Sequence, residues 1–275
     1  MRAFFQRFAR HRGALLGLVI LTAVLLMALA GPFIYPRNAF ELVGQPFREP
    51  FGKYLLGTDS LGRDVAAGIV EGARTSLMIG ALAAVAATML GTLIGGFAGY
   101  FGGLLDDVLM RTTEFFQTIP SFIFAILLVA LMQPSVQSVV IAISVVSWPP
   151  MARLVRGEFL ALRNREFVQA CVGMGMTDIR VIFLHVLPNC MSSIIVTGSL
   201  LVATAILTES GLSFLGLGDP NVMSWGYMVG ASRDFLRHAW WLCAIPGIAI
   251  MLTVLSINLV GDGLNDALNP GLRRT

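Results

Sequence analysis

Long apolar stretches alternate with short polar ones along most of the chain. An apolar run of about 20 residues is enough for a helix to cross the hydrocarbon core of a bilayer. About six such runs occur, at residues 14–35, 77–101, 115–132, 135–154, 190–213 and 239–260. Pro120, Pro149 and Pro150 lie in or beside the third and fourth runs, and because proline kinks or ends a helix, a count of five remains open. The pattern predicts an all-α polytopic membrane protein with about six transmembrane helices.

The composition supports a membrane protein. Of the 275 residues, 56% are hydrophobic and 13% are charged, whereas soluble domains have roughly half apolar and a quarter charged residues. Cys171, Cys190 and Cys243 form no CxxC pair and no even set, so neither a disulfide framework nor a zinc module is favoured. We expect these cysteines to be packing residues.

The arginines orient the spans, because segments that stay in the cytoplasm retain Lys and Arg near the membrane. Arginines gather in three places: before the first span, at the end of the fourth span and after it, and in the tail. They are Arg2, Arg7, Arg10 and Arg12; Arg153, Arg156, Arg163, Arg165 and Arg180; and Arg273 and Arg274. All three places lie on the same side of the membrane, so this distribution predicts both termini in the cytoplasm. The basic start and the "ALA" at 28–30 also describe a secretory signal peptide, but the apolar run continues to Tyr35, long enough to span.

Four glycines in the second span share one helix face. They stand at strict four-residue spacing, at Gly91, Gly95, Gly99 and Gly103. Small residues on one face let another helix backbone approach closely. The pattern is compatible with a contact inside the chain or with a contact between subunits.

The chain lacks a loop that could hold ATP. Such a loop has the pattern GxxxxGK[ST], in which a lysine reaches the phosphates. Lys53 is the only lysine; Gly52 precedes it, but Phe47 and Tyr54 stand where the pattern requires Gly and Ser or Thr. If ATP drives this protein, another polypeptide must bind it.

Other chemistries need ionisable or nucleophilic groups in the membrane. Glu209 lies roughly 12 Å outward from the middle of the fifth span, so it is either a helix-end carboxylate satisfied by neighbours or part of a transport route. Intramembrane proteolysis needs a serine nucleophile and a histidine base, for which Ser213 and His238 are the candidates, but His238 is better explained as an interfacial residue. His11 and His185 have no second ligand at a useful spacing, so no metal site is expected.

The segment from Arg165 to Asn189 is too charged to span a bilayer and too apolar for a solvated loop. It contains two short apolar patterns of helical period, separated by Gly175. Thr177 or Asp178 can cap the second helix, and Pro188 marks the turn into the fifth span. On the residues alone, two interpretations remain: one face with the small residues Ala170, Cys171 and Gly173 fits a groove of a partner, or the helix rests passively on lipid.

The residue identities in this segment resemble the EAA loop of binding-protein-dependent ABC importer permeases, whose pattern is Glu-Ala-Ala, three residues, Gly, nine residues, then Ile-x-Leu-Pro. The aligned positions are Gln169, Ala170, Cys171, Gly175, His185, Leu187 and Pro188. The spacing is intact, while Gln169, Cys171 and His185 depart from the most usual Glu, Ala and Ile. These departures put in doubt any salt bridge assumed for the family's glutamate.

In that family the loop forms the coupling helix, which the resemblance places at about 165–187. The residues assigned to ATPase coupling on this ground are Glu166, Gln169, Ala170, Cys171, Gly175, Thr177, Asp178, His185, Leu187 and Pro188.

Further motifs extend the resemblance over essentially the whole chain, to the second permease subunit of the dipeptide, oligopeptide and nickel importer family. They are "LGTDSLGRDV" at 56–65, "GARTSL" at 72–77, "ESGLSFLGLG" at 209–218, "SWG" at 224–226 and "GDGLNDALNP" at 261–270. In the last of these, the family commonly has Arg where Asn265 stands and Asp where Asn269 stands. The resemblance implies a type I ABC importer permease fold, with an N-terminal part at 1–75 and a permease core at 76–275.

The resemblance also implies an assembly. The chain would pair as a heterodimer with a homologous permease in a bacterial-type inner membrane, with two ATPase subunits and an extracytoplasmic binding protein. ATP and Mg would be bound by the ATPases, and the chain itself would hold no cofactor, metal or catalytic residue and bind no nucleic acid. Di- and oligopeptides are the expected solutes; nickel chelates or other small solutes, or a secondary transporter, are the alternatives.

Three external residues and three membrane residues complete the candidate sites. Asp59 or Ser60 is expected to cap a short external helix running to about Arg74. Asp59, Arg63 and Asp64 are candidates for contact with a binding protein or for local capping and ion pairs. Ser144, Ser147 and Asn258 are candidates for the translocation pathway, with helix–helix hydrogen bonds as the equal alternative.

Overall fold

In the part of the chain that the structure describes, five helices are long and apolar enough to cross a membrane, and a bent pair of shorter helices makes six if it is counted as one span. The five are α2 (Arg12–Ile34), α3 (Val65–Phe101), α6 (Val136–Arg163), the run of α8, η1 and α9 (Asp178–Phe214), and α11 (Trp241–Leu268). The computed structural model describes residues 8–9 and 11–268. The arginines at positions 2, 7, 10, 273 and 274, together with Asn269 and Pro270, lie outside the described residues. The prediction of an all-α chain with five or six spans is confirmed.

The bent pair consists of α4 (Gly103–Thr118) and α5 (Ser121–Met132), which meet at 86°. Pro120 stands at the break, where its ring and missing N–H prevent α4 from continuing. The third apolar run of the sequence is therefore a broken element. In contrast, Pro149 and Pro150 lie inside α6, which runs on without a break.

Helix α3 begins later and extends further than the sequence suggested. Asp64 is its cap: the carboxylate Oδ1 accepts a hydrogen bond from Ala66 N at 3.0 Å. The helix then continues for 37 residues to Phe101. The expected short helix, capped by Asp59 or Ser60 and ending near Arg74, is wrong, because nothing after residue 65 interrupts the helical hydrogen bonds. The boundary drawn between residues 75 and 76 lies within α3.

The glycine face of α3 packs on α6, the most extensive helix pair in the fold. A Cβ built on Gly91 would lie 2.7 Å from Trp148 O, and one built on Gly99 would lie 2.7 Å from Arg156 O. Gly95 faces the backbone of Ala152 still more closely. Gly103 belongs to α4 and has nothing within 4 Å of such a Cβ. The glycines thus serve a contact inside the chain.

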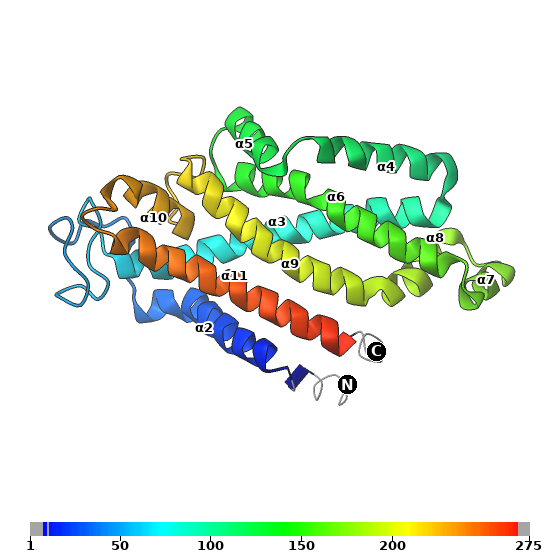
Figure 1. Cartoon of the computed structure of the whole chain (residues 1–275), viewed down its shortest axis with the longest axis horizontal. Coiled ribbons are helices and arrows are strands. Elements are labelled where there is room, and N and C mark those ends of the chain that lie inside the picture. The colour runs from blue at the N-terminus through cyan, green and yellow to red at the C-terminus, as the bar shows by residue number, and fades with distance from the viewer. Residues whose placement is uncertain (1–7, 10, 269–275) are drawn as a thin grey trace.

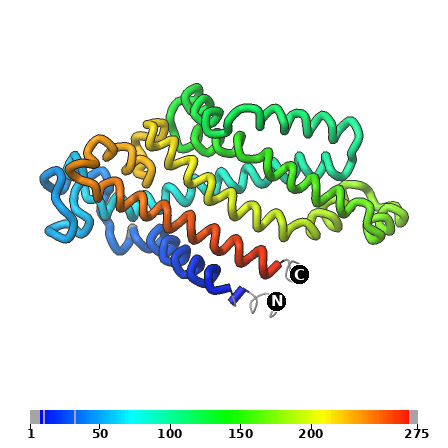
Figure 2. The backbone as a smooth tube through the Cα atoms, viewed as in Figure 1, coloured from blue at the N-terminus to red at the C-terminus, as the bar shows by residue number. Residues whose placement is uncertain are grey.

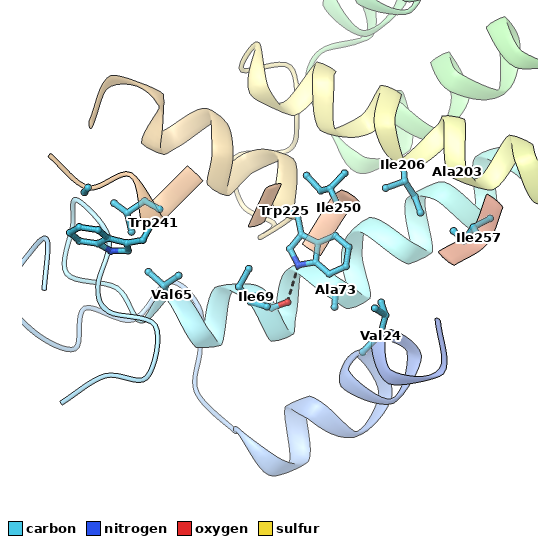
Figure 3. Packing of buried hydrophobic residues seen from close by; sticks show 13 residues of the cluster. Val24, Val65, Ile69, Ala73, Ala203, Ile206, Trp225, Trp241, Ile250 and Ile257 are labelled. Carbon is cyan, nitrogen blue, oxygen red and sulfur yellow. Dashed lines mark hydrogen bonds between the residues drawn. The ribbon is translucent and has the colours of Figure 1, made fainter. Parts of the chain in front are cut away.

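Trp225 anchors the short helix α10 (Trp225–Ser232) in the largest buried apolar cluster. Its ring is fully buried, and its Nε1 donates a hydrogen bond to Ile69 O of α3 at 3.0 Å (Figure 3). Figure 3 also shows Ile206 of α9 and Ile250 of α11 nearer to this ring, with Ala203 and Ile257 of the same cluster further along the bundle. A 3₁₀ turn, η2 (Arg233–Phe235), connects α10 toward α11.

The two ends of the bundle differ. At one end lie α7 (Glu166–Gly173), α8 (Asp178–Val181) and the π-helical turn η1 (Ile182–Val186) (Figure 1). The turn η1 continues directly into α9 (Leu187–Phe214). At the other end lie α10 and the loop between α2 and α3, seen at the left in Figure 2. Helix α2 begins and α11 ends in the half of the molecule that carries α7 (Figure 1).

Candidate functional site

The segment formed by α7, α8 and η1 is a bent helical unit at one end of the bundle, as the sequence predicted. Gly175 makes the bend: its φ of +77° belongs to the left-handed region that glycine adopts without strain. Its N–H donates to Val172 O at 2.9 Å, and Met176 N donates to Cys171 O at 3.2 Å, which closes the carboxyl end of α7. Glycine is required here by backbone conformation.

One face of this segment is anchored in the chain's own core. Val168 and Cys171 of α7 are buried together with Val181, Ile182 and Val186, against Met151, Val155 and Phe159 of α6. Cys171 is 6% exposed, so its side chain does not face a partner in this structure. The sequence placed Ala170, Cys171 and Gly173 on one docking face; the structure separates Cys171 from the other two.

The opposite face is open. Of the residues assigned to coupling, those exposed are Glu166, Gln169, Ala170, Gly175, Thr177, Asp178 and Pro188, while His185 and Leu187 are half-buried. Asp178 accepts a hydrogen bond from the hydroxyl of Tyr100 at 2.9 Å, which ties the second helix to the end of α3. The exposed apolar side chains of this face are Phe167, Val172, Met174 and Ile179. Exposed apolar side chains of this kind are typical of a contact with another protein or with lipid.

The π-helical turn η1 joins the open segment to the long helix α9. Leu187 N donates to Ile182 O, five residues back, instead of four. Pro188 has no N–H for the carbonyl four residues earlier, which favours this local change. Single π turns of this kind occur frequently at functional sites, and this one lies between α8 and α9.

Glu209 is buried among serine hydroxyls. Its carboxylate is 1% exposed and accepts hydrogen bonds from Ser213 and Ser224 at 2.8 Å each and from Ser76 and Ser210 at 3.4 Å each. These serines come from α3, α9 and the residue preceding α10. The geometry is that of a carboxylate satisfied by its neighbours, one of the two interpretations that the sequence left open. The motifs "GARTSL", "ESGLSFLGLG" and "SWG" therefore meet at the Glu209 carboxylate.

Asp64 is enclosed within the chain. The residue is 1% exposed, and its Oδ2 accepts hydrogen bonds from the Tyr35 hydroxyl and from Arg37 Nη1, the latter at 2.9 Å. Burial raises the pKa of Tyr35, and the hydrogen bond to Asp64 raises it further, so the hydroxyl remains a donor at neutral pH. Asp64 therefore ties the end of α2 to the start of α3.

Asp59 and Arg63 are half-buried and organise the loop locally. Asp59 Oδ1 accepts from Leu61 N at 2.9 Å and from Arg63 N at 2.8 Å. The Arg63 guanidinium lies 4.9 Å from the centre of the Phe40 ring. These contacts fit the alternative of local capping; contact with a binding protein stays a prediction.

Of the three residues predicted to line a pathway, Ser144 lies in a helix contact. It is 9% exposed, and its hydroxyl is 2.6 Å from Val140 O and 3.3 Å from Ala83 O of α3. Ser147 and Asn258 are half-buried. The helix–helix alternative therefore describes Ser144, and the pathway role of the other two stays a prediction.

A polar cavity between α4 and α6 was missed by the sequence reasoning. It is lined by Asp107, Met110, Arg111, Glu114, Arg153 and Arg156. Beside it, Arg156 donates two hydrogen bonds to Asp106, at 2.5 and 2.7 Å. A sequence signal existed: Asp107, Arg111 and Glu114 stand at i, i+4 and i+7, one face of a helix. These residues lie between the apolar runs at 77–101 and 115–132, in a part of the chain for which the sequence predicted no helix.

The fold and these sites define a class, a multi-pass α-helical membrane permease of the type I ABC importer fold. Two solved structures of the methionine ABC transporter MetNI in inward-facing conformations share this fold. One has a TM-score of 0.62 and 15% identity, covering 74% of this chain and 96% of the other; the second has 0.61 and 16%, covering 73% and 95%.

Sequence comparison then gives the family. The model described as binding-protein-dependent transport system inner membrane component matches residues 91–274, and the N-terminal TM domain of oligopeptide transport permease C matches residues 1–47. The chain belongs to the binding-protein-dependent transport system inner membrane components, and it is thus a multi-pass permease of the inner membrane.

The relatives match over nearly their full length. A di/tripeptide transport system permease protein DppC of Pseudomonas aeruginosa is 39% identical, covering 99% of this chain and 93% of the relative. A dipeptide transport system permease protein DppC of Alkalihalophilus pseudofirmus is also 39% identical, with 99% and 90% covered. The oligopeptide transport system permease protein OppC of Bacillus subtilis is 38% identical, with 98% and 88% covered.

Proposed function

We propose that this chain carries di- and oligopeptides across the inner membrane as one of two permeases of an ATP-driven importer. The observation that carries the proposal is the full-length similarity to permeases named for di-, tri- and oligopeptide transport. The second permease, two ATPase subunits and an extracytoplasmic binding protein complete the assembly. ATP and Mg are bound by the ATPases, and both termini of this chain lie in the cytoplasm.

In this proposal, the open face of α7 and the turn at Gly175 form the surface to which an ATPase subunit docks. Support comes from the exposed side chains of Phe167, Val172 and Met174 beside the small residue Ala170. Closure of the ATPases on ATP moves α7, and the buried face of the segment passes the movement to α6 and, through η1, to α9. Transport follows because the partners bind the inward and outward forms with different free energies.

The test reconstitutes the four kinds of subunit in proteoliposomes and measures ATP-dependent uptake of a labelled tripeptide. We expect uptake with ATP and none with a proton gradient alone. Uptake by this chain alone, driven by a proton gradient, would show a secondary transporter instead.

The docking surface is tested with Ala170→Trp. A bulky side chain there should weaken ATPase binding about tenfold, since overpacking at a contact costs about 1–3 kcal/mol. Ala161→Trp is the matched control, because Ala161 is also an exposed alanine but lies at the end of α6 outside the segment. Co-purification of the ATPases reports the result; equal binding by both variants contradicts the assignment of this face.

A further inference from the structure

The polar cavity between α4 and α6 has a volume of about 410 Å³, within the range of small-molecule sites. Five of its six lining residues are charged; they are Asp107, Arg111 and Glu114 of α4 and Arg153 and Arg156 of α6. Part of this charge is compensated inside the chain, since Asp107 and Glu114 both interact electrostatically with Arg156. The bidentate pair with Asp106 satisfies Arg156, and Arg153 hydrogen-bonds to Gln117.

The cavity therefore presents a balanced set of open charges. Among the described residues, Arg111, Arg153, Asp107 and Glu114 take part in no salt bridge. Two cations and two anions face one space, and a ligand that matches them must itself carry both signs of charge. A free peptide does so, with an ammonium at one end and a carboxylate at the other.

These charges lie near the inner end of the spans. Helix α6 has 28 residues and is roughly 42 Å long, about 12 Å more than a hydrocarbon core of about 30 Å. Arg153 lies ten residues before the end of α6 at Arg163, roughly 15 Å along the axis, and is therefore close to the inner boundary of the core. Arg156 lies one helical turn further toward the side where the arginines predict the cytoplasm, and Glu114 of α4 lines the same cavity.

The cavity lies beside two other sides of α4. The exposed apolar residues Leu104, Val108 and Phe115 share one side. Asp107 and Glu114 lie on the side next to it, and Arg111 lies at the edge between the two. Asp106 and Thr113 form the buried side toward α6, so the cavity opens away from the chain's own core.

We propose that this cavity binds the transported peptide at the inner end of the pathway. Arg111 and Arg153 bind the terminal carboxylate, and Asp107 and Glu114 bind the terminal ammonium, through charge-assisted hydrogen bonds. The inference rests on the proposed function, because it takes a peptide as the solute. It assigns the pathway to charged residues of α4 and α6, in addition to the polar residues that the sequence suggested.

The first test measures ATP-driven uptake of trialanine by the complete importer. Arg111→Gln and Glu114→Gln should each lower uptake about tenfold, the usual effect of losing a hydrogen bond to a charged group. Arg12→Gln and Asp262→Asn are the matched controls, since they remove exposed charges in the same half of the molecule, away from the cavity. The controls should transport as the wild type does.

The second test reports occupancy directly. Met110→Cys places a thiol in the cavity without altering its charges, and a sulfonated maleimide should label it in the assembled importer. Trialanine should slow this labelling, and the additional change Arg111→Gln should remove the protection. Labelling of Ala161→Cys, outside the cavity, should be unaffected by trialanine, and the wild type sets the background from its native cysteines.

The outcomes separate the two proposals. A Met110→Cys variant that stays unlabelled throughout the ATP cycle would show that the partner permease fills the cavity, which overturns the inference. Labelling without protection, combined with normal uptake by Arg111→Gln, also overturns it. If the wild-type importer takes up no peptide, the proposed function fails and the inference fails with it.

Discussion

Among the described residues, every hydrogen bond to the Glu209 carboxylate comes from a serine hydroxyl, and none comes from a cation. Ser210 also donates to Ile206 O at 2.8 Å, so three hydroxyls, those of Ser76, Ser213 and Ser224, depend on this carboxylate as their acceptor. Their removal from water is compensated while that carboxylate is present. Glu209 is best described as a structural acceptor that joins α3, α9 and the start of α10.

Replacing this acceptor should destabilise the chain. Glu209→Ala should cost about 2 kcal/mol or more, because it leaves buried hydroxyls without a partner and opens a cavity. Glu209→Gln should be much milder, since its amide oxygen still accepts. The thermal midpoint of the purified chain in detergent, followed by tryptophan fluorescence, measures the difference. Glu41→Ala, at an exposed carboxylate, is the control, and equal midpoints for the two alanine variants would refute the structural role.

At the scale of elements, the sequence was most informative where a local residue pattern was enough to predict a helix contact or a bend. The glycine spacing predicted a close helix contact, and Gly91, Gly95 and Gly99 make it. The bend at Gly175 followed from the two apolar patterns on either side of it. Both features depend on residues near one another in the sequence.

The sequence was least informative where distant residues decide. Asp64 caps α3 because Tyr35 and Arg37 meet it from the end of α2, a contact that spacing alone does not reveal. Cys171 points into the core because α6 lies behind α7. The cavity beside α4 exists only once α6 brings Arg153 and Arg156 opposite Arg111 and Glu114. The contacts of Asp64, the burial of Cys171 and the cavity beside α4 all depend on which helices pack together, and the sequence did not reveal this.

The packing of α3 on α6 predicts that an alanine at the helix contact destabilises the protein, whereas an alanine on an exposed side of α6 does not. Gly95→Ala should cost about 1–3 kcal/mol, because its Cβ would meet the backbone of Ala152, which cannot rotate away. Gly157→Ala, on an exposed side of α6 with nothing within 4 Å, should be neutral or stabilising by up to about 1 kcal/mol. Thermal unfolding of both variants checks the contrast, and equal stability would mean that the two helices separate easily.

For the whole molecule, the two ends of the bundle should face opposite sides of the membrane. The end with α7 carries Arg163, Arg165 and Arg180, and such basic clusters favour the cytoplasm. In intact spheroplasts, a membrane-impermeant maleimide should label Asn221→Cys near α10, and should label Ala161→Cys only after permeabilisation. Both positions are exposed in the structure, so access depends on the side of the membrane. The reverse pattern would invert the proposed orientation.

The serine cluster around Glu209 also restricts how this protein can diverge. Ser76, Ser213 and Ser224 lie far apart along the chain, yet each donates to the same carboxylate. In a homologue with an apolar residue at position 209, the three buried hydroxyls would have lost this hydrogen-bond acceptor. Substitutions at positions 76, 213 and 224 should therefore accompany the change at 209. Positions 76, 209, 213 and 224, which lie in three different sequence motifs, are therefore expected to covary.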